Sequence, residues 1–286
     1  MTRIIYRSLC FAVLCGIVAA PGCQQPLTCE SSSVQERPIV YKTTPQGDLK
    51  MHLFGCDRRG ARPAIVFFFG GGWVGGSPEQ FFPHCRHLAS LGMVAISAEY
   101  RVRSRHGTTP FECVADGKSA VRYIREHAKE LGVDPDRVIA AGGSAGGHVA
   151  ACTATVTAYD EESEDHAISS SPDAMVLFNP VVDTTRLGYG AKRFKGDPRV
   201  LSPVHHIRAG VPPTLIFHGT ADTTVPFENV ERFRKTMRGA GNECMLVPFE
   251  GKKHGFFNYN REEDHRSYNE TIEHTERFLR MHGYVK

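Results

Sequence analysis

Short apolar runs alternate with longer stretches of helical periodicity along most of the chain. Several of these runs are nearly continuous in Val, Ile, Leu and Phe, which is typical of strands buried on both faces of a parallel sheet. We expect strands at Lys50–Phe54, Ala64–Phe69, Met93–Ala98, Arg137–Ala141, Ala174–Phe178, Thr214–His218 and Met245–Phe249.

Between these runs, apolar residues recur with the spacing of one helix face, as Val114, Val121 and Ile124 do. The alternation predicts an α/β fold, in which a mostly parallel central sheet of about eight strands carries helices on both faces. Catalytic groups in such folds gather at the carboxyl ends of the strands. We expect helices at Gln80–Leu91, Phe111–Leu131, Ala145–Tyr159, Phe227–Gly239 and Arg266–Met281.

Two segments interrupt the alternation. Asp160–Pro172 is acidic and rich in serine, so we expect a surface loop. Asp183–Val211 contains several glycines and prolines. We interpret it as a short cap over the site, with a long plain connection as the alternative.

The N-terminus has the composition of a secretory signal. Arg3 and Arg7 precede an apolar run from Leu9 to Ala20, which is too short for a comfortable transmembrane helix. Cys23 follows small residues, as in a bacterial lipobox, and is a candidate lipid anchor. We therefore divide the chain into a signal peptide at 1–22, a tether at 23–37 and a folded domain at 38–286. The protein is expected to be exported, as a periplasmic, membrane-anchored or extracellular protein.

Composition narrows the function classes only slightly. A hydrophobic fraction of 41% in 286 residues is enough for one large domain with its own core. The net charge of +3 is too weak to favour nucleic acid or a membrane surface as a partner.

Neither cysteine nor histidine spacing predicts a metal site. The nine cysteines show no zinc-type pairs, and we expect most of those beyond the signal to be small core residues. His84, His87, His205 and His206 lack carboxylate or cysteine partners at useful spacing, so we interpret them as structural or surface residues. No metal and no cofactor are expected.

The glycine-rich run Gly142–Gly147 contains the strongest chemical signal. It lies between the apolar run Val138–Ala141 and a helical stretch, and it fits the G-x-S-x-G nucleophile elbow. Glycines beside the serine avoid side-chain clashes in so tight a turn. Ser144 is therefore the candidate nucleophile, although a glycine-rich loop with an incidental serine has the same local pattern.

Two later residues complete a possible catalytic triad, because a serine needs a base and the base needs an orienting acid. Asp222 follows the strand predicted at 214–218, and His254 follows the one at 245–249. The order Ser, Asp, His is that of α/β-hydrolases. Alternatives remain: Asp222 as a turn or capping residue, Glu228 as the acid, and His254 as an ordinary one of fourteen histidines.

A second glycine run, residues 70–76, follows another predicted strand. Backbone N–H groups in such a loop can hold the negative charge that develops during acyl transfer. We assign Gly71 and Gly72 as donors, with the N–H of Ala145 as a third. A phosphate-binding loop is disfavoured, because no Gly-Lys-Ser/Thr follows. Trp73 is a candidate wall of the substrate pocket, with core packing as the alternative.

A basic segment lies after the strand predicted at 93–98. Arg103, Arg105 and His106 would favour an acidic or polysaccharide substrate if they reach the site, but the simpler interpretation is a solvated surface loop. We expect Arg101 to make a structural salt bridge.

Together these motifs resemble α/β-hydrolase esterases of the hormone-sensitive-lipase and related bacterial type, over about residues 50 to 282. The resemblance implies serine hydrolysis of carboxylic esters through an acyl-enzyme, without a cofactor; some relatives deacetylate xylan or cleave other plant-polysaccharide esters. It rests on Gly70–Trp73, Ala98–Arg101, Asp134–Arg137, Gly143–Gly147, His218–Asp222 and His254–Phe256.

This sequence departs from the family pattern at two positions. Phe69 replaces the histidine that usually precedes the oxyanion glycines, and Gly143 replaces an acidic residue before the nucleophile. The backbone donors are unaffected, so we expect the chemistry to persist while the elbow and the oxyanion loop rely more on packing than is usual for such enzymes.

The resulting expectation is an exported serine esterase for short-acyl esters, acetyl first, on a small molecule or a polysaccharide such as acetylated xylan. Two alternatives stay open. A peptidase of the prolyl-oligopeptidase type shares the elbow, but that type carries a large additional N-terminal domain. A non-catalytic binding protein on the same fold would commonly have lost a member of the triad, whereas this chain keeps all three.

Overall fold

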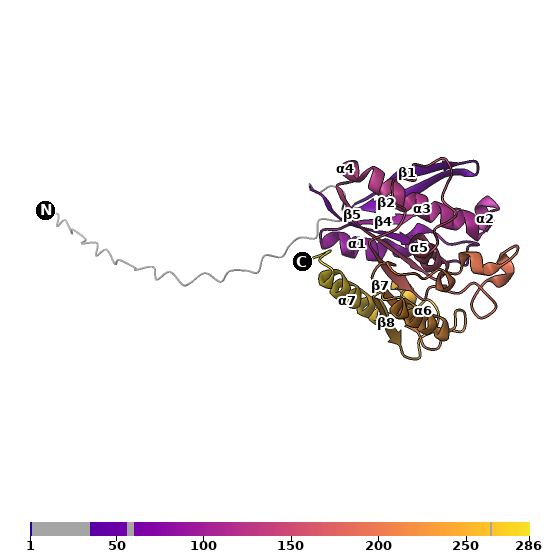
Figure 1. The fold of residues 1–286 in the computed structure, drawn as a ribbon. Coiled ribbons are helices and arrows are strands. Elements are labelled where there is room, and N and C mark those ends of the chain that lie inside the picture. Colours follow the sequence, from indigo (N-terminus) through magenta and orange to yellow (C-terminus); the bar gives the residue numbers. More distant parts are fainter. Residues whose placement is uncertain (2–34, 56–59, 264) are drawn as a thin grey trace. The chain divides into compact units, whose positions relative to one another are not determined.

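An eight-stranded sheet forms the centre of the protein (Figure 1). The computed structural model describes residues 1, 35–55, 60–263 and 265–286. The strand order is β1-β2-β4-β3-β5-β6-β7-β8. The strands are β1 (Glu36–Thr44), β2 (Gly47–Phe54), β3 (Arg62–Phe68), β4 (Val94–Ala98), β5 (Val133–Gly143), β6 (Ala174–Phe178), β7 (Thr214–Gly219) and β8 (Cys244–Phe249).

The sheet is mostly parallel, as the sequence predicted. Strands β4, β3, β5, β6, β7 and β8 run parallel to one another, while β1 and β2 form an antiparallel hairpin against β4. The parallel strands β3, β4 and β6 are buried almost throughout, which explains their continuous apolar sequences.

Helices cover both faces of this sheet. One core cluster contains Val66 of β3 and side chains of α3, α5 and α6, such as Val121, Val149 and Phe233. The opposite cluster contains Ile65 of β3 and side chains of α1 and α7. The helices are α1 (Phe82–Ser90), α2 (Arg103–His106), α3 (Pro110–Glu126), α4 (Ala128–Leu131), α5 (Ala145–Thr155), α6 (Phe227–Gly239) and α7 (Arg266–Met281).

Most differences from the predicted elements lie at their ends. The helix predicted at 111–131 is divided into α3 and α4, and the one predicted at 145–159 already ends at Thr155. The helix predicted at 80–91 begins with a 3-10 turn, Pro78–Phe81. The short helix α2 was not predicted at all.

The boundary of the folded domain needs a correction. Glu36 and Arg37 belong to β1, so the predicted tether at 23–37 extends too far. The sequence pattern did not predict this edge strand, because it begins with exposed charged residues instead of an apolar run. Cys23 and nearly all of the predicted signal and tether lie outside the described residues. Within the described residues, no helix combines the length and apolar character needed to cross a membrane.

The segment Asp183–Val211 connects β6 to β7. It contains three 3-10 turns, at Ala191–Arg193, Pro198–Leu201 and Pro203–His205, rather than a helical cap domain. Its Tyr189 lines the cavity that contains Ser144. The segment therefore forms part of the wall of the candidate site.

Candidate active site

Ser144 occupies a sharp turn between β5 and α5. Its φ and ψ of 54° and −118° lie in a region that side-chain-bearing residues rarely adopt. Backbone hydrogen bonds hold it there: its N–H donates to the Phe178 carbonyl at 2.8 Å, and its carbonyl accepts from the N–H of His148 at 3.0 Å. The serine is fixed in a strained backbone conformation, as the elbow motif requires.

Two flanking glycines permit this turn. A Cβ added at Gly142 would lie 2.5 Å from the Gly146 carbonyl oxygen, and one added at Gly146 would lie 2.0 Å from the Phe68 carbonyl oxygen. Both distances are far below any real contact, so the backbone can approach itself here only because the two side chains are absent.

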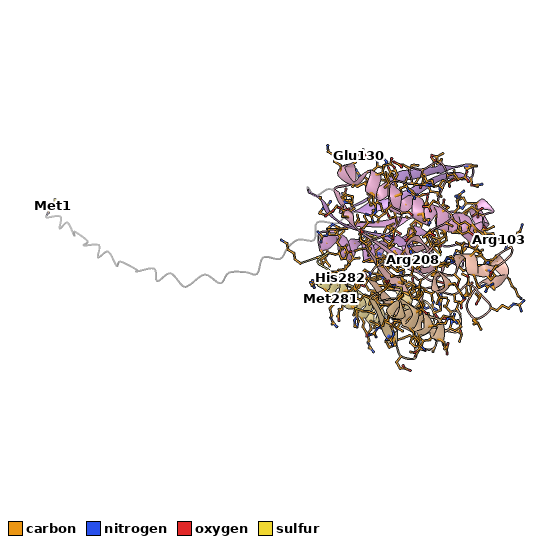
Figure 2. The ribbon with its side chains drawn as sticks, in the orientation of Figure 1. Met1, Arg103, Glu130, Arg208, Met281 and His282 are labelled. Atoms are coloured by element: carbon orange, nitrogen blue, oxygen red, sulfur yellow. The ribbon has the colours of Figure 1, made fainter. Side chains whose placement is uncertain are left out.

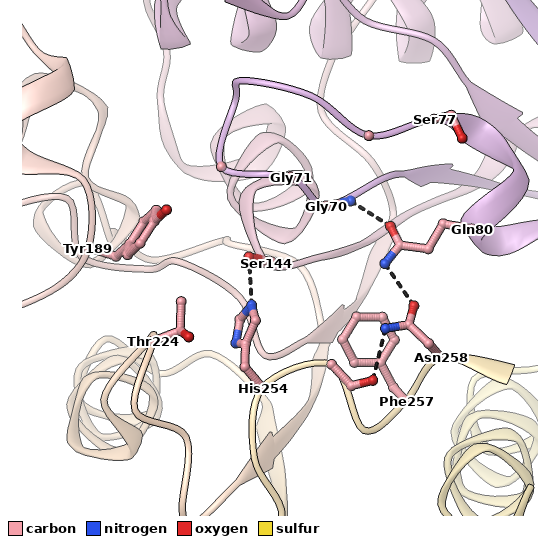
Figure 3. A pocket seen from close by; sticks show the side chains of 13 residues that line it. Gly70, Gly71, Ser77, Gln80, Ser144, Tyr189, Thr224, His254, Phe257 and Asn258 are labelled. Carbon is pink, nitrogen blue, oxygen red and sulfur yellow. Dashed lines mark hydrogen bonds between the residues drawn. The ribbon is translucent and has the colours of Figure 1, made fainter. Parts of the chain in front are cut away.

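The three residues of the predicted triad lie in hydrogen-bond contact. Figure 3 shows the contact between Ser144 and His254. The Oγ of Ser144 is 2.9 Å from Nε2 of His254. The Nδ1 of the same ring is 2.7 Å from Oδ2 of Asp222. Glu228, the alternative acid, is an exposed residue in the first turn of α6 and makes no such contact.

Asp222 is buried and fully supported by donors. Its Oδ2 accepts from the Asn179 amide at 2.6 Å, and its Oδ1 accepts from the N–H groups of Thr224 at 2.8 Å and Val225 at 3.0 Å. Burial opposes ionisation, but hydrogen bonds from His218, His254 and the Val225 N–H outweigh it and hold the pKa of Asp222 far below its ordinary value. Asp222 is therefore ionised at neutral pH, beside His254.

Asn179 was not identified from the sequence. It directly follows the strand predicted at 174–178, so the rule that pointed to Asp222 and His254 would have marked it as well. Its amide meets the carboxylate oxygen that also faces His254. We assign it as a residue that positions Asp222.

Two of the three predicted oxyanion donors, Gly71 and Gly72, border the same cavity. Gly71 and Gly72 have φ values of 132° and 62°, conformations that favour glycine. Within the described residues, the N–H groups of Gly71 and Gly72 have no hydrogen-bond acceptor. Ala145 is the first residue of α5, where helix N–H groups lack intrahelical acceptors.

A series of side-chain hydrogen bonds braces this loop, which corrects the expectation that it relies on packing more than is usual. The N–H of Gly70 donates to Oε1 of Gln80 at 2.6 Å. The Nε2 of Gln80 donates to Oδ1 of Asn258 at 2.8 Å, and Nδ2 of Asn258 donates to the Gly255 carbonyl at 2.8 Å. This series connects the oxyanion loop to the loop that carries His254 (Figure 3).

Phe69 also makes more than apolar contacts. Its ring stacks on Tyr100 with a centroid separation of 4.2 Å, and its carbonyl accepts a hydrogen bond from the Tyr100 hydroxyl at 2.6 Å. The loop therefore has polar support from Gln80 and Tyr100 in place of the usual histidine.

Packing does explain the second departure. A Cβ at Gly143 would lie 2.5 Å from the ring of Phe257 and 3.2 Å from that of Phe81. An acidic side chain before the nucleophile has no room here, because Phe257 fills the space that it would occupy.

The expectation that Trp73 lines the cavity at Ser144 is not met. Trp73 is 1% exposed and is absent from the residues that border the cavity at Ser144. Its Nε1 donates to Nδ1 of His148 at 3.2 Å, and its ring lies 5.7 Å from that of Tyr189. The core-packing alternative describes it: Trp73 supports the residue that borders the cavity.

The cavity itself has a volume of about 530 Å³. Figure 3 shows the hydrogen bonds of Gln80 on one side of Ser144, and Tyr189 and Thr224 on the other. Its walls come from the oxyanion loop, the elbow, the 183–211 segment and the histidine loop: Gly70, Gly71, Gly72, Gly76, Ser77, Gln80, Ser144, Tyr189, Thr224, His254, Gly255, Phe257 and Asn258.

No metal site accompanies it in the part of the chain that the structure describes, where no three His, Cys, Asp or Glu side chains gather closely enough to hold an ion. His84 is buried among the rings of Phe81, Phe178 and Tyr268 and serves as core. The described cysteines, Cys85, Cys113, Cys152 and Cys244, are all buried and free.

Comparisons with known proteins agree with this geometry. A family model described as BD-FAE matches residues 54–237. The chain is 27% identical over 242 residues to the probable isoprenylcysteine alpha-carbonyl methylesterase ICMEL1 of Arabidopsis thaliana, a match covering 76% of this chain and 50% of that protein. It is 31% identical over 216 residues to the probable carboxylic ester hydrolase LipM of Mycobacterium tuberculosis, covering 68% and 49%. The chain thus spans about half the length of these curated relatives.

Solved structures give a longer match. The propionate-bound esterase Est2 of the Planctomycetes species Thermogutta terrifontis is 49% identical, with a TM-score of 0.82 over 90% of this chain and 97% of that one. The eight-stranded, mostly parallel sheet with helices on both faces is accordingly the α/β-hydrolase fold. From the fold, the nucleophile elbow and the matching family model together, we conclude that the chain belongs to the BD-FAE family of α/β-hydrolase serine esterases.

Proposed function

We propose that this protein hydrolyses carboxylic esters through a covalent acyl-enzyme on Ser144. The observation that carries the proposal is the unbroken hydrogen-bonded series from Ser144 Oγ through His254 to Asp222, beside a loop with unoccupied N–H donors. A serine hydroxyl is a weak nucleophile at neutral pH, and a histidine within hydrogen-bond reach provides the base that it needs.

In the first half of the reaction, Nε2 of His254 takes the Ser144 proton as Oγ attacks the ester carbonyl carbon. The carbonyl oxygen becomes negative and accepts hydrogen bonds from the N–H groups of Gly71, Gly72 and Ala145. The tetrahedral intermediate collapses, the carbon–oxygen bond to the alcohol breaks, and the alcohol leaves with the proton held by His254. The acyl group remains on Ser144.

In the second half, His254 takes a proton from water, and the resulting hydroxide attacks the acyl carbonyl. The same backbone donors stabilise the second oxyanion. Collapse releases the carboxylic acid and returns the proton to Ser144. Asp222 orients the imidazole ring and stabilises its positive charge in both halves without itself taking a proton.

We propose short acyl groups, acetyl first, as the substrate class. The resemblance to esterases that deacetylate xylan supports this choice, and a polysaccharide ester is the natural source of acetyl groups for an exported enzyme. The Est2 structure with propionate supports a small acid as well, since the two chains share nearly half of their residues.

The test is a series of p-nitrophenyl esters of increasing acyl length together with acetylated xylan and feruloyl esters. We expect the highest kcat/KM with acetate or propionate, and a loss of about 10⁶-fold in kcat for Ser144→Ala. A preference for long acyl chains would refute the short-acyl proposal. Cleavage of prolyl peptides, or no turnover of any ester by folded protein, would favour the peptidase or the binding protein instead.

We also propose export, based on the charged and apolar pattern of residues 3–20 and on Cys23. The expected result of cell fractionation is protein outside the cytoplasm, and Cys23→Ser would convert a membrane-associated form to a released one if Cys23 carries lipid. Accumulation of the wild-type protein in the cytoplasm would contradict the proposal.

A further inference from the structure

Two further hollows adjoin the cavity at Ser144. One, of about 820 Å³, shares Tyr189 with that cavity, and the other, of about 280 Å³, shares Gly72 with it. The two hollows also share walls with each other, at Arg103, Lys192 and Arg193. The two hollows are therefore neighbours beside the oxyanion loop and the 183–211 segment, and together we call them the depression.

Positive charge dominates the walls of this depression. They contain five cationic side chains and no acidic residue: Arg103, Arg186, Lys192, Arg193 and Lys195. Four of them are exposed, and Arg193 is half-buried. This local excess of positive charge contrasts with the net charge of only +3 over the whole sequence.

The charges of these cations are not neutralised by neighbouring carboxylates. Among the described residues, none of the five side chains makes an ion pair with a carboxylate. The nearest acidic residues along the segment already have partners, since Asp183 pairs with Arg232 and Asp197 with Arg199 at 2.8 Å. The positive charges are thus free to bind an anion from outside.

Packing contacts and a backbone hydrogen bond connect the walls of the depression to those of the catalytic cavity. The guanidinium of Arg193 lies 5.8 Å from the centre of the Tyr189 ring, and that ring packs against Trp73 beside the oxyanion glycines. Arg103 is the first residue of α2, and its backbone N–H donates to the Trp73 carbonyl at 3.0 Å. Figure 2 labels Arg103 next to the orange ribbon of the 183–211 segment. Arg103 of the basic segment therefore borders this depression, although it does not line the cavity at Ser144 itself.

We infer that this depression, defined by Arg103, Arg186, Lys192, Arg193 and Lys195, is a subsite for the chain of an acidic polysaccharide, one that carries uronate carboxylates near its acetyl esters. The inference rests on the proposed esterase function. Several guanidinium and ammonium groups spaced along a hollow match carboxylates repeated along a polymer, and each pair forms a charge-assisted hydrogen bond. The aromatic ring of Tyr189 adds an apolar face for a sugar at the junction.

An anionic membrane is the competing ligand, because Leu187 beside these cations is 70% exposed. The polysaccharide is favoured since the cations line concave walls, and a single exposed leucine provides little apolar surface for insertion into lipid.

The kinetic test compares acetylated polygalacturonate with acetylated glucomannan, an uncharged polymer. In the double variant Arg103→Gln/Lys192→Gln, the ratio of kcat/KM for the acidic polymer to that for the neutral one should fall about fivefold to tenfold. Lys235→Gln removes an exposed cation on α6, away from the depression, and should leave the ratio unchanged. Added salt should lower the rate on the acidic polymer selectively.

A binding test separates this inference from the proposed function. The Ser144→Ala variant should be retarded in native gels that contain polygalacturonate and not in gels that contain glucomannan, whether or not the protein is an esterase. Failure of the wild type on p-nitrophenyl acetate would count against the esterase proposal alone. Equal ratios in the double variant and the wild type, or binding to phosphatidylglycerol vesicles without binding to polygalacturonate, would overturn the acidic-polysaccharide subsite.

Discussion

Individual residues around Ser144 show how tightly the site is packed. The strained backbone of the serine depends on glycines at positions 142 and 146, where any Cβ would collide with a backbone carbonyl oxygen. At position 143 the constraint comes from a side chain instead, the ring of Phe257. Backbone contacts thus require glycine at positions 142 and 146, whereas a side-chain contact requires it at position 143. The elbow motif implies only the glycines at 142 and 146.

The contact at position 143 predicts a compensated substitution. Gly143→Ala should lower the free energy of unfolding by about 1–3 kcal/mol, because the new methyl group forces Phe257 to shift. In a Phe257→Leu background the same substitution should cost clearly less. Urea unfolding of the four proteins in this cycle measures the difference, and an equal cost in both backgrounds would show that the clash with Phe257 is not responsible.

The identity of the acid is a second prediction at this scale. Asp222→Asn should lower kcat by about 10⁴-fold, since the amide would favour the wrong tautomer of His254. Glu228→Gln is the matched control: it neutralises the other candidate acid, which is exposed on α6, and should change kcat little. Steady-state kinetics with p-nitrophenyl acetate decides between them, and a larger loss for the Glu228 variant would exclude Asp222 as the acid.

At the scale of elements, three separate loops must be held in one arrangement. The oxyanion loop follows β3, the elbow follows β5 and the histidine loop follows β8, so the sheet sets only their approximate positions. The chain from Gly70 through Gln80 and Asn258 to Gly255 connects the first of these loops to the last.

Removing this connection should reduce catalysis more than stability. Gln80→Met keeps the length of the side chain but removes both polar atoms, so the oxyanion loop loses its brace. We expect kcat to fall about tenfold to hundredfold, because small misplacements of catalytic groups are that costly. Gln46→Met applies the same substitution to an exposed glutamine that contacts Arg101, outside the residues that line the cavity. Equal kcat values for both variants and the wild type would show that the hydrogen bonds of Gln80 to Gly70 and Asn258 have no positioning role.

The elements differ in how well the sequence predicted them. Interior strands such as β6, whose predicted bounds match the structure, are buried on both faces and carry a continuous apolar signal. The edge strand β1 shows no such run, since most of its residues face solvent. Pairing of Gln80 with Asn258 spans 178 positions, and nothing in the local sequence of either residue indicates it. Asp222 and His254 were predictable because a strand end, a residue type and the chain order all agreed.

For the whole molecule, the two faces of the sheet contain buried histidines that the chemistry does not use. His84 is buried among aromatic rings, and neither of its ring nitrogens has a hydrogen-bond partner among the described residues. Burial lowers the pKa of His84 to about 3 and that of His148 to about 4. Both rings are therefore neutral in the folded protein near neutral pH.

These shifts predict an acid-sensitive fold. In the unfolded chain a histidine takes up its proton below about pH 6.5, whereas folded His84 does so only near pH 3, so acid favours unfolding between these values. His84→Phe should remove the part of this dependence that is due to His84 and leave the part due to His148. From about pH 7 to about pH 4.5 the wild type should lose about 3 kcal/mol more unfolding free energy than the variant. Exposed His166→Phe is the control and should follow the wild type; parallel curves for wild type and His84→Phe would contradict the assignment.

The central claim is that Ser144 is a nucleophile activated by His254, and covalent labelling tests it most directly. Paraoxon reacts with an activated serine oxygen, which displaces p-nitrophenolate and keeps the diethylphosphoryl group. Wild-type protein should release one equivalent of p-nitrophenolate and carry the corresponding mass on the peptide that contains Ser144. The folded Ser144→Ala variant should carry none. A folded wild type that stays unlabelled, or a variant labelled to the same extent, would contradict the claim.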